Sequence, residues 1–123
     1  MRVLLSIKPE FATKIFDGSK KYEYRRIIFK NKNVNKVIVY ASSPTSLIIG
    51  EFEIDDIIHD ELPALWARTK SHAGISERGF SEYFTDKSRG YAIKVKTPKR
   101  YQQPLPLHSV TLSPPPQSFV YLG

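Results

Sequence analysis

The sequence contains no cysteine, which excludes disulfide bonds and any chemistry that needs a thiolate. A zinc site would therefore have to be built from histidines and carboxylates alone. The three histidines, His59, His72 and His108, lie far apart and form no pair at the spacing of a helix or a hairpin. We therefore expect neither a metal site nor a cofactor.

Long hydrophobic segments are also absent. The first seven residues, MRVLLSI, form a short apolar run that ends at Lys8 and Pro9, so they match neither a signal peptide nor a membrane span. A length of 123 residues fits one domain covering residues 1–123, and a hydrophobic content of 41% is typical of a globular chain. These features predict a cytoplasmic protein with no membrane partner.

The positive charge is concentrated in the first third of the chain. Residues 1–36 contain ten Lys or Arg and three Asp or Glu, whereas the remaining residues contain nine of each. The whole net charge of +7 therefore arises from this first third. A positive face of this kind attracts polyanions, and a solubilising surface explains the same asymmetry equally well.

Hydrophobic periodicity predicts several short strands and few helices. Pro9 and Gly18 bracket the first helix, and Asp60 and Ser76 are candidate N-caps for the other two. Because the links between the middle strands are too short for helical crossovers, we expect an α+β domain with a small, mainly antiparallel β-barrel and flanking short helices. The predicted strands cover residues 2–7, 20–29, 36–41, 47–58, 90–96 and 117–122, with a proline-rich tail from residue 97, and the predicted helices cover 9–17, 61–70 and 77–84.

The segment LLSIKPEFATKIFDGSKKYEYR resembles the beginning of ASCH domains, in which a strand ending in Lys-Pro leads through a helix to a G-x-K-x-x-E-x-R signature. The signature positions are Gly18, Lys20, Glu23 and Arg25. The strands GEFEI and GYAIKVK and the closing segment PPQSF are also similar to members of the family. The resemblance implies a PUA-like barrel whose cleft, lined by Lys8 and the last three signature residues, takes RNA or a modified nucleoside.

Physical chemistry gives each of these side chains a task. Arg25 can present a planar fork to a phosphate, while Lys8 and Lys20 act as point charges. Glu23 could accept a hydrogen bond from a base or from a ribose 2′-hydroxyl. The alternative is that Glu23 and Arg25 form an ion pair on one face of a strand and take no part in binding.

Further candidates lie in the basic strand, in a turn and near the C-terminus. Tyrosines near the basic strands, such as Tyr24 and Tyr40, are expected in the core more often than in stacking on bases. Gln117 could read a base edge, or its segment could simply close the fold. With these, the predicted nucleic-acid-binding residues are Lys8, Lys20, Lys21, Glu23, Arg25, Arg26, Ser42, Ser43 and Gln117.

Enzymatic activity is the first alternative to simple RNA binding. Some ASCH relatives are amidohydrolases that use a lysine, a threonine and a glutamate, and Lys20 matches the lysine. Glu23 stands in the position of the threonine, and the segment SHAGIS supplies no glutamate before Glu77, which argues against that activity. Other relatives are proposed metal-independent ribonucleases, for which Lys8, Lys20 and a hydroxyl of Ser42 or Ser43 could serve.

A helix-turn-helix that binds DNA is the second alternative, suggested by the segment WARTKSHAGISERGFSEYF. Residues 61–87 carry four acidic and four basic side chains, whereas a recognition helix facing phosphates is basic. We therefore favour a plain helical hairpin packed beside the sheet. RNA is the expected partner ahead of DNA, and the oligomeric state cannot be predicted from these patterns.

Overall fold

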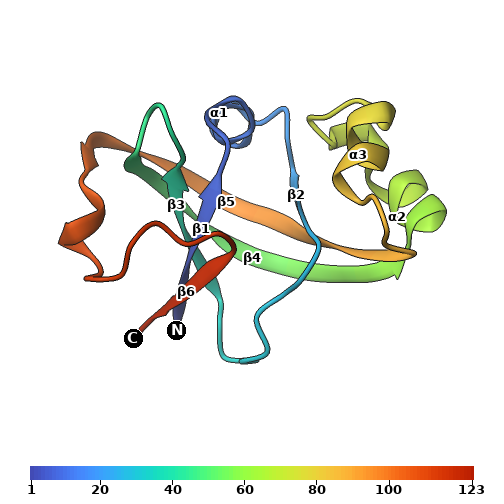
Figure 1. The fold of residues 1–123 in the computed structure, drawn as a ribbon. Coiled ribbons are helices and arrows are strands. Elements are labelled where there is room, and N and C mark those ends of the chain that lie inside the picture. Colours follow the sequence, from blue (N-terminus) through green and yellow to red (C-terminus); the bar gives the residue numbers. More distant parts are fainter.

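The computed structural model describes all residues from Met1 to Gly123. The elements are β1 (Arg2–Ile7), α1 (Pro9–Asp17), β2 (Tyr22–Arg25), β3 (Lys36–Ala41), β4 (Leu47–Glu61), α2 (Leu62–Thr69), η1 (Lys70–His72), α3 (Glu77–Tyr83), β5 (Arg89–Leu105), η2 (Leu107–Ser109) and β6 (Phe119–Leu122). The six strands form one sheet in the order β2-β5-β4-β3-β1-β6. We call residues 106–123, which follow β5, the C-terminal segment. Figure 1 shows the long β4–β5 pair crossing the molecule, with α2 and α3 at one end and the C-terminal segment at the other.

The sheet confirms the predicted α+β class but is not closed into a barrel. All strand pairs are antiparallel except β1 with β3, which run parallel. The edge strands β2 and β6 have only four residues each and do not pair with one another. Instead, the Arg25 guanidinium of β2 donates across the gap to the carbonyl of Ser118, just before β6. A side chain therefore bridges the seam that a backbone ladder would close in a barrel.

The strand predictions are accurate for two strands and differ from the structure at the ends of the other four. Strands β1 and β3 have the predicted bounds. Strand β2 covers only Tyr22–Arg25, β4 continues to Glu61, β5 continues to Leu105, and β6 begins at Phe119. The proline-rich tail was predicted to begin at Thr97, but β5 pairs with β4 as far as Leu105. Past Lys94 the other edge of β5 has no strand partner, so prolines that lack an N–H are tolerated there.

Two helix ends follow the predicted capping rules and one does not. Gly18 ends α1 in the left-handed region with φ 87°, and the Ser76 hydroxyl accepts from the N–H of Gly79 at 3.0 Å. Asp60 does not cap α2, because β4 extends through Glu61 and the Asp60 carboxylate binds the Glu61 N–H and Arg68 instead.

The buried side chains form three clusters. The largest lies between α1 and the sheet, around Ile15, Val37 and Phe52. A second joins the sheet to α2 and α3 through Leu65, Phe80 and Phe84, which agrees with the helical hairpin predicted beside the sheet. The third packs the C-terminal segment against β1, β3 and β4. None of the helices has the length and apolar character needed to span a membrane.

Candidate nucleic-acid interface

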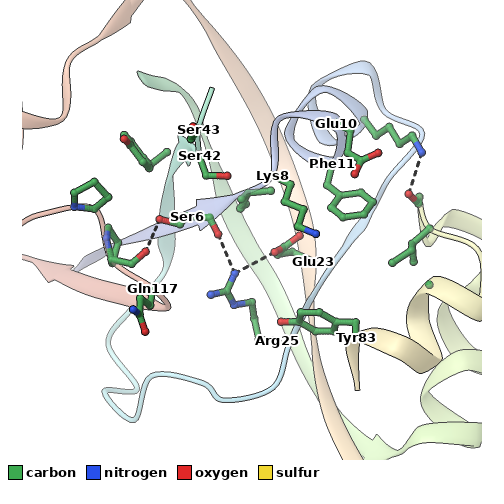
Figure 2. Close-up of a pocket in the computed structure, with 18 of the residues that line it drawn as sticks. Ser6, Lys8, Glu10, Phe11, Glu23, Arg25, Ser42, Ser43, Tyr83 and Gln117 are labelled. Atoms are coloured by element: carbon green, nitrogen blue, oxygen red, sulfur yellow. Dashed lines mark hydrogen bonds and ion pairs between the residues drawn. The ribbon is translucent and has the colours of Figure 1, made fainter. Parts of the chain in front are cut away.

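A cleft of about 990 Å³ opens at the seam between β2 and the C-terminal segment, and we call it the main cleft. It is bounded by the end of β1, the first turn of α1, β2, the β3–β4 turn and α3, as Figure 2 shows. The lining combines hydroxyl groups, aromatic rings and charged side chains. Its residues are Ser6, Ile7, Lys8, Glu10, Phe11, Lys14, Glu23, Arg25, Tyr40, Ser42, Ser43, Ser46, Gly74, Ile75, Ser76, Gly79, Glu82, Tyr83, Pro115, Pro116 and Gln117.

Six of the nine predicted binding residues line the main cleft, and three do not. Those in the lining are Lys8, Glu23, Arg25, Ser42, Ser43 and Gln117. Lys20 lies behind the wall of the cleft, and the exposed Lys21 is outside it. Arg26 points to the end of α3, where its Nη1 donates to the carbonyls of Tyr83 and Thr85.

Glu23 and Arg25 face the same side of β2 because alternate residues of a strand share a face. Arg25 Nη1 lies 3.3 Å from Glu23 Oε2 and donates to the Ser6 carbonyl at 3.2 Å. Arg25 Nη2 donates to the Ser118 carbonyl at 3.0 Å. These contacts, drawn in part in Figure 2, show the ion pair that was the alternative to a free phosphate-binding arginine. Arg25 thus holds β1, β2 and the C-terminal segment together at the floor of the cleft.

The C-terminal segment is fixed at the cleft by a second contact. The Ser6 hydroxyl donates to the Pro116 carbonyl at 2.6 Å, which places Pro115, Pro116 and Gln117 along the rim. The Gln117 amide forms no side-chain hydrogen bond within the chain and remains available to a ligand.

The charges that line the main cleft balance. Its cations are Lys8, Lys14 and Arg25, and its carboxylates are Glu10, Glu23 and Glu82. The predicted basic cleft is therefore not confirmed by the lining side chains. Among the cations, Arg25 is paired with Glu23 and Lys14 donates to the Gly74 carbonyl, so Lys8 is the one with no hydrogen bond or ion pair to the protein.

Lys20 occupies a closed position next to the cleft. It is 2% exposed, its Nζ donates to the Ala73 carbonyl at 2.6 Å, and the ammonium lies 4.8 Å from the centre of the Tyr24 ring. Burial lowers the pKa of Lys20, and the nearby Glu23 carboxylate partly opposes that effect. A small cavity of about 50 Å³ beside Lys20 shares Phe11, Glu23, Ile75 and Tyr83 with the main cleft.

Gly74 explains how Lys20 is held. Its φ of 67° disfavours other residues, and a Cβ there would lie 2.6 Å from the Lys20 methylenes. The loop after η1 therefore packs its backbone directly on the stem of Lys20.

Several lining residues were not predicted from the sequence. Glu10, Phe11 and Lys14 come from α1, while Glu82 and Tyr83 come from α3. Phe11 and Lys14 are three residues apart and therefore lie on one helix face, which could have identified them as neighbours in the site. The sequence could not predict that α3 lines the same cleft as α1, because this arrangement depends on the tertiary fold. No group of three or more His, Cys, Asp or Glu is arranged to hold a metal ion.

Comparisons with known proteins agree with this architecture. Residues 5–100 match the model of the ASCH domain. A protein of Zymomonas mobilis named ASCH domain-containing ribonuclease is 30% identical over 97% of this chain and 82% of its own length. The crystal structure of ASCH from Zymomonas mobilis superimposes with a TM-score of 0.90 at 27% identity, covering 99% of this chain and 87% of that one.

A longer relative matches over only part of its length. The large ribosomal subunit protein uL22 of Ureaplasma parvum is 27% identical over 98% of this chain, which spans 39% of that protein. The match of the family model to most of the chain, together with the Zymomonas relative, establishes the classification. The chain belongs to the ASCH domain family.

Proposed function

We propose that this protein binds single-stranded RNA and holds a nucleotide segment in the main cleft. The observation that carries the proposal is a cleft of about 990 Å³ that combines aromatic rings, hydroxyls and one free cation. Unstacked bases of single-stranded RNA are recognised by ring stacking and by hydrogen bonds to their edges. The similarity to a protein named as a ribonuclease supports RNA as the ligand class.

The balanced charge of the lining favours contacts to base and ribose over a run of phosphates. Glu23 uses Oε2 for Arg25, so its Oε1 is left to accept from a base N–H or a 2′-hydroxyl. Gln117 and the hydroxyls of Ser42 and Ser43 can donate or accept on the opposite side. Lys8 at the mouth is the group suited to one phosphate.

The test is the affinity for a short single-stranded RNA and for DNA of the same sequence, measured across a salt series. We expect RNA to bind more tightly than DNA. Lys8→Ala should lower the slope of log affinity against log salt by about 0.7, the share of one phosphate contact on a single strand. The matched control is Lys70→Ala, since Lys70 is exposed and lies outside the cleft.

Equal, weak binding of RNA and DNA that responds alike to both substitutions would contradict the proposal. That result would reduce the interaction to general attraction by a basic protein.

RNA cleavage is the second candidate function, favoured by the buried Lys20 beside the cleft. Because burial lowers the pKa of Lys20, more of its amine is neutral than for an exposed lysine, and a neutral amine can act as a general base. In the presence of a metal chelator, this candidate predicts that the wild type shortens RNA and that Lys20→Met, which keeps the length of the stem, does not. RNA that stays intact with the wild type excludes it.

A further inference from the structure

A second pocket of about 450 Å³ lies outside the main cleft. It is formed by the chain that follows β2, the loop between α3 and β5, and three side chains of β4 and β5. Its residues are Arg26, Ile27, Ile28, Lys30, His59, Asp86, Lys87, Ser88, Arg89 and Tyr91, none of which lines the main cleft.

The second pocket is strongly basic, unlike the main cleft. Four cations, Arg26, Lys30, Lys87 and Arg89, line it with one carboxylate, Asp86. The five ion pairs of the protein involve none of these four cations. Their charge is therefore not neutralised by a close carboxylate partner, and the pocket is suited to an anion.

Two of the cations are held in place by neutral groups. Arg26 Nη1 donates to the carbonyls of Tyr83 at 2.9 Å and Thr85 at 2.7 Å, and Arg89 Nη2 donates to the His59 carbonyl at 3.5 Å. Carbonyls fix a guanidinium without cancelling its charge, and each guanidinium keeps further N–H donors. Lys30 and Lys87 form no side-chain hydrogen bond and are free to reach a ligand.

Aromatic and apolar groups accompany the cations. The rings of His59 and Tyr91 stack with their centroids 4.1 Å apart and their planes at 10°. Ile27, which is 53% exposed, adds apolar surface to the pocket. Single-stranded nucleic acids bind to surfaces that combine cations with aromatic rings.

The second pocket adjoins the main cleft across β2 and α3. Arg25 lines the main cleft, and the next residue, Arg26, lines the second pocket. The Tyr83 side chain lines the cleft, while its carbonyl accepts from Arg26. We infer that the second pocket binds the phosphate backbone of an RNA strand whose neighbouring nucleotides occupy the main cleft. This inference rests on the proposed function. It assigns the bases and riboses of the RNA to the main cleft and the phosphates of the neighbouring nucleotides to the second pocket.

The experiment compares a trinucleotide, which fills only the cleft, with a single-stranded RNA of about 12 nucleotides, which reaches both sites. The double variant Lys30→Ala/Lys87→Ala should bind the longer RNA about tenfold more weakly, with a salt slope lower by about 1.4, the share of two phosphate contacts. Its affinity for the trinucleotide should equal that of the wild type. The matched control, Lys70→Ala/Lys99→Ala, removes the same charge at exposed positions outside both pockets.

Each further outcome has one meaning. If the wild type binds neither RNA, the proposed function fails. If it binds both and the Lys30/Lys87 variant weakens the longer RNA no more than the control does, the second pocket is only part of a diffuse basic surface and the inference is overturned. If that variant weakens both RNAs equally, the separation into two sites is wrong.

Discussion

Lys20 is the most buried cation of the chain, at 2% exposure, and its ammonium is satisfied by a carbonyl and by ring faces instead of a carboxylate at contact distance. The methylenes of its stem pack on Gly74. Such a residue contributes to the stability of the fold through packing as well as through charge, because its long stem covers apolar surface. Lys8, by contrast, is exposed and makes no side-chain contact of this kind.

Replacing Lys20 with Ala should destabilise the fold. The substitution leaves a void under Gly74 and removes the donor from the Ala73 carbonyl, so we expect the free energy of unfolding to fall by about 2–3 kcal/mol. Lys8→Ala should change it by less than about 0.5 kcal/mol. Urea denaturation of the two variants measures the difference, and equal midpoints would show that the Lys20 contacts contribute nothing. For the same reason, a loss of RNA binding in Lys20→Ala says little about the cleft unless the fold is checked.

At this scale the sequence predicts part of the candidate site. Alternation along β2 is a local property, so the shared face of Glu23 and Arg25 follows from their spacing. The position of Lys20 behind the wall does not follow, because it depends on Gly74 and α3, which are more than fifty residues away along the chain. The position of Arg26, another predicted binding residue, does not follow either, because the carbonyls of Tyr83 and Thr85 that hold it are equally distant in sequence.

At the scale of single elements, α3 is a largely exposed wall of the site. Its seven residues bury only Phe80, yet they bring Glu82 and Tyr83 to the main cleft and provide the Tyr83 carbonyl that accepts from Arg26. A helix this short has little stability of its own. Its N-cap and the packing of Phe80 against Tyr24 and Phe84 therefore determine whether the wall is ordered.

Removing the cap of α3 should loosen this wall. Ser76→Ala deletes the hydroxyl that accepts from the Gly79 N–H, and we expect a loss of about 1 kcal/mol in the free energy of unfolding. Hydrogen exchange of the α3 amides should increase more than that of the β4 amides. The matched control is Ser81→Ala, an exposed position inside the same helix, which should be neutral or slightly stabilising. If Ser76→Ala increased hydrogen exchange equally in α3 and β4, the cap would have no local role.

The elements whose signals are local were predicted well. Helix α1 lies between the proline and the glycine that mark its ends, and β1 and β3 have the expected bounds. Strand β2 was predicted too long and β5 too short, because partners elsewhere in the chain set their ends. Residues 91–94 of β5 are all that β2 can pair with, and β4 holds β5 in the sheet as far as Leu105.

At the scale of the whole molecule, the main cleft exists because the sheet remains open. The two edge strands meet at a seam bridged by Arg25, and the cleft lies along this seam between β1, β2 and the C-terminal segment. A barrel closed by a backbone ladder would fill this space with paired strands. The sequence predicted a closed barrel because it signals how many strands there are, not whether the last edges pair.

Tyr24 connects this open sheet to the helices, and its ionisation should make the stability of the whole fold depend on pH. Thr69 Oγ1 donates to the Leu65 carbonyl at 2.7 Å, so the Tyr24 hydroxyl is the donor in its 2.6 Å contact with Thr69 Oγ1. Burial raises the pKa of Tyr24 from 10.0 to about 12, although the Thr69 hydrogen bond opposes the effect. Between these two pH values the folded state keeps a proton that the unfolded state loses, so stability falls as pH rises.

Tyr24→Phe tests this link. At pH 7 the variant loses the hydrogen bond to Thr69 and should be less stable than the wild type by about 1 kcal/mol. As pH rises from 10.0 towards about 12, the wild type should lose stability through Tyr24 while the variant does not, so the difference between them should shrink. Lys20 has the opposite effect on stability, because its lowered pKa makes stability rise with pH up to 10.5. Since Lys20 is present in both proteins, its effect largely cancels in the difference between them. Urea denaturation across this pH range measures the difference, and a constant gap would show that Tyr24 ionises as readily in the folded protein as in the unfolded chain.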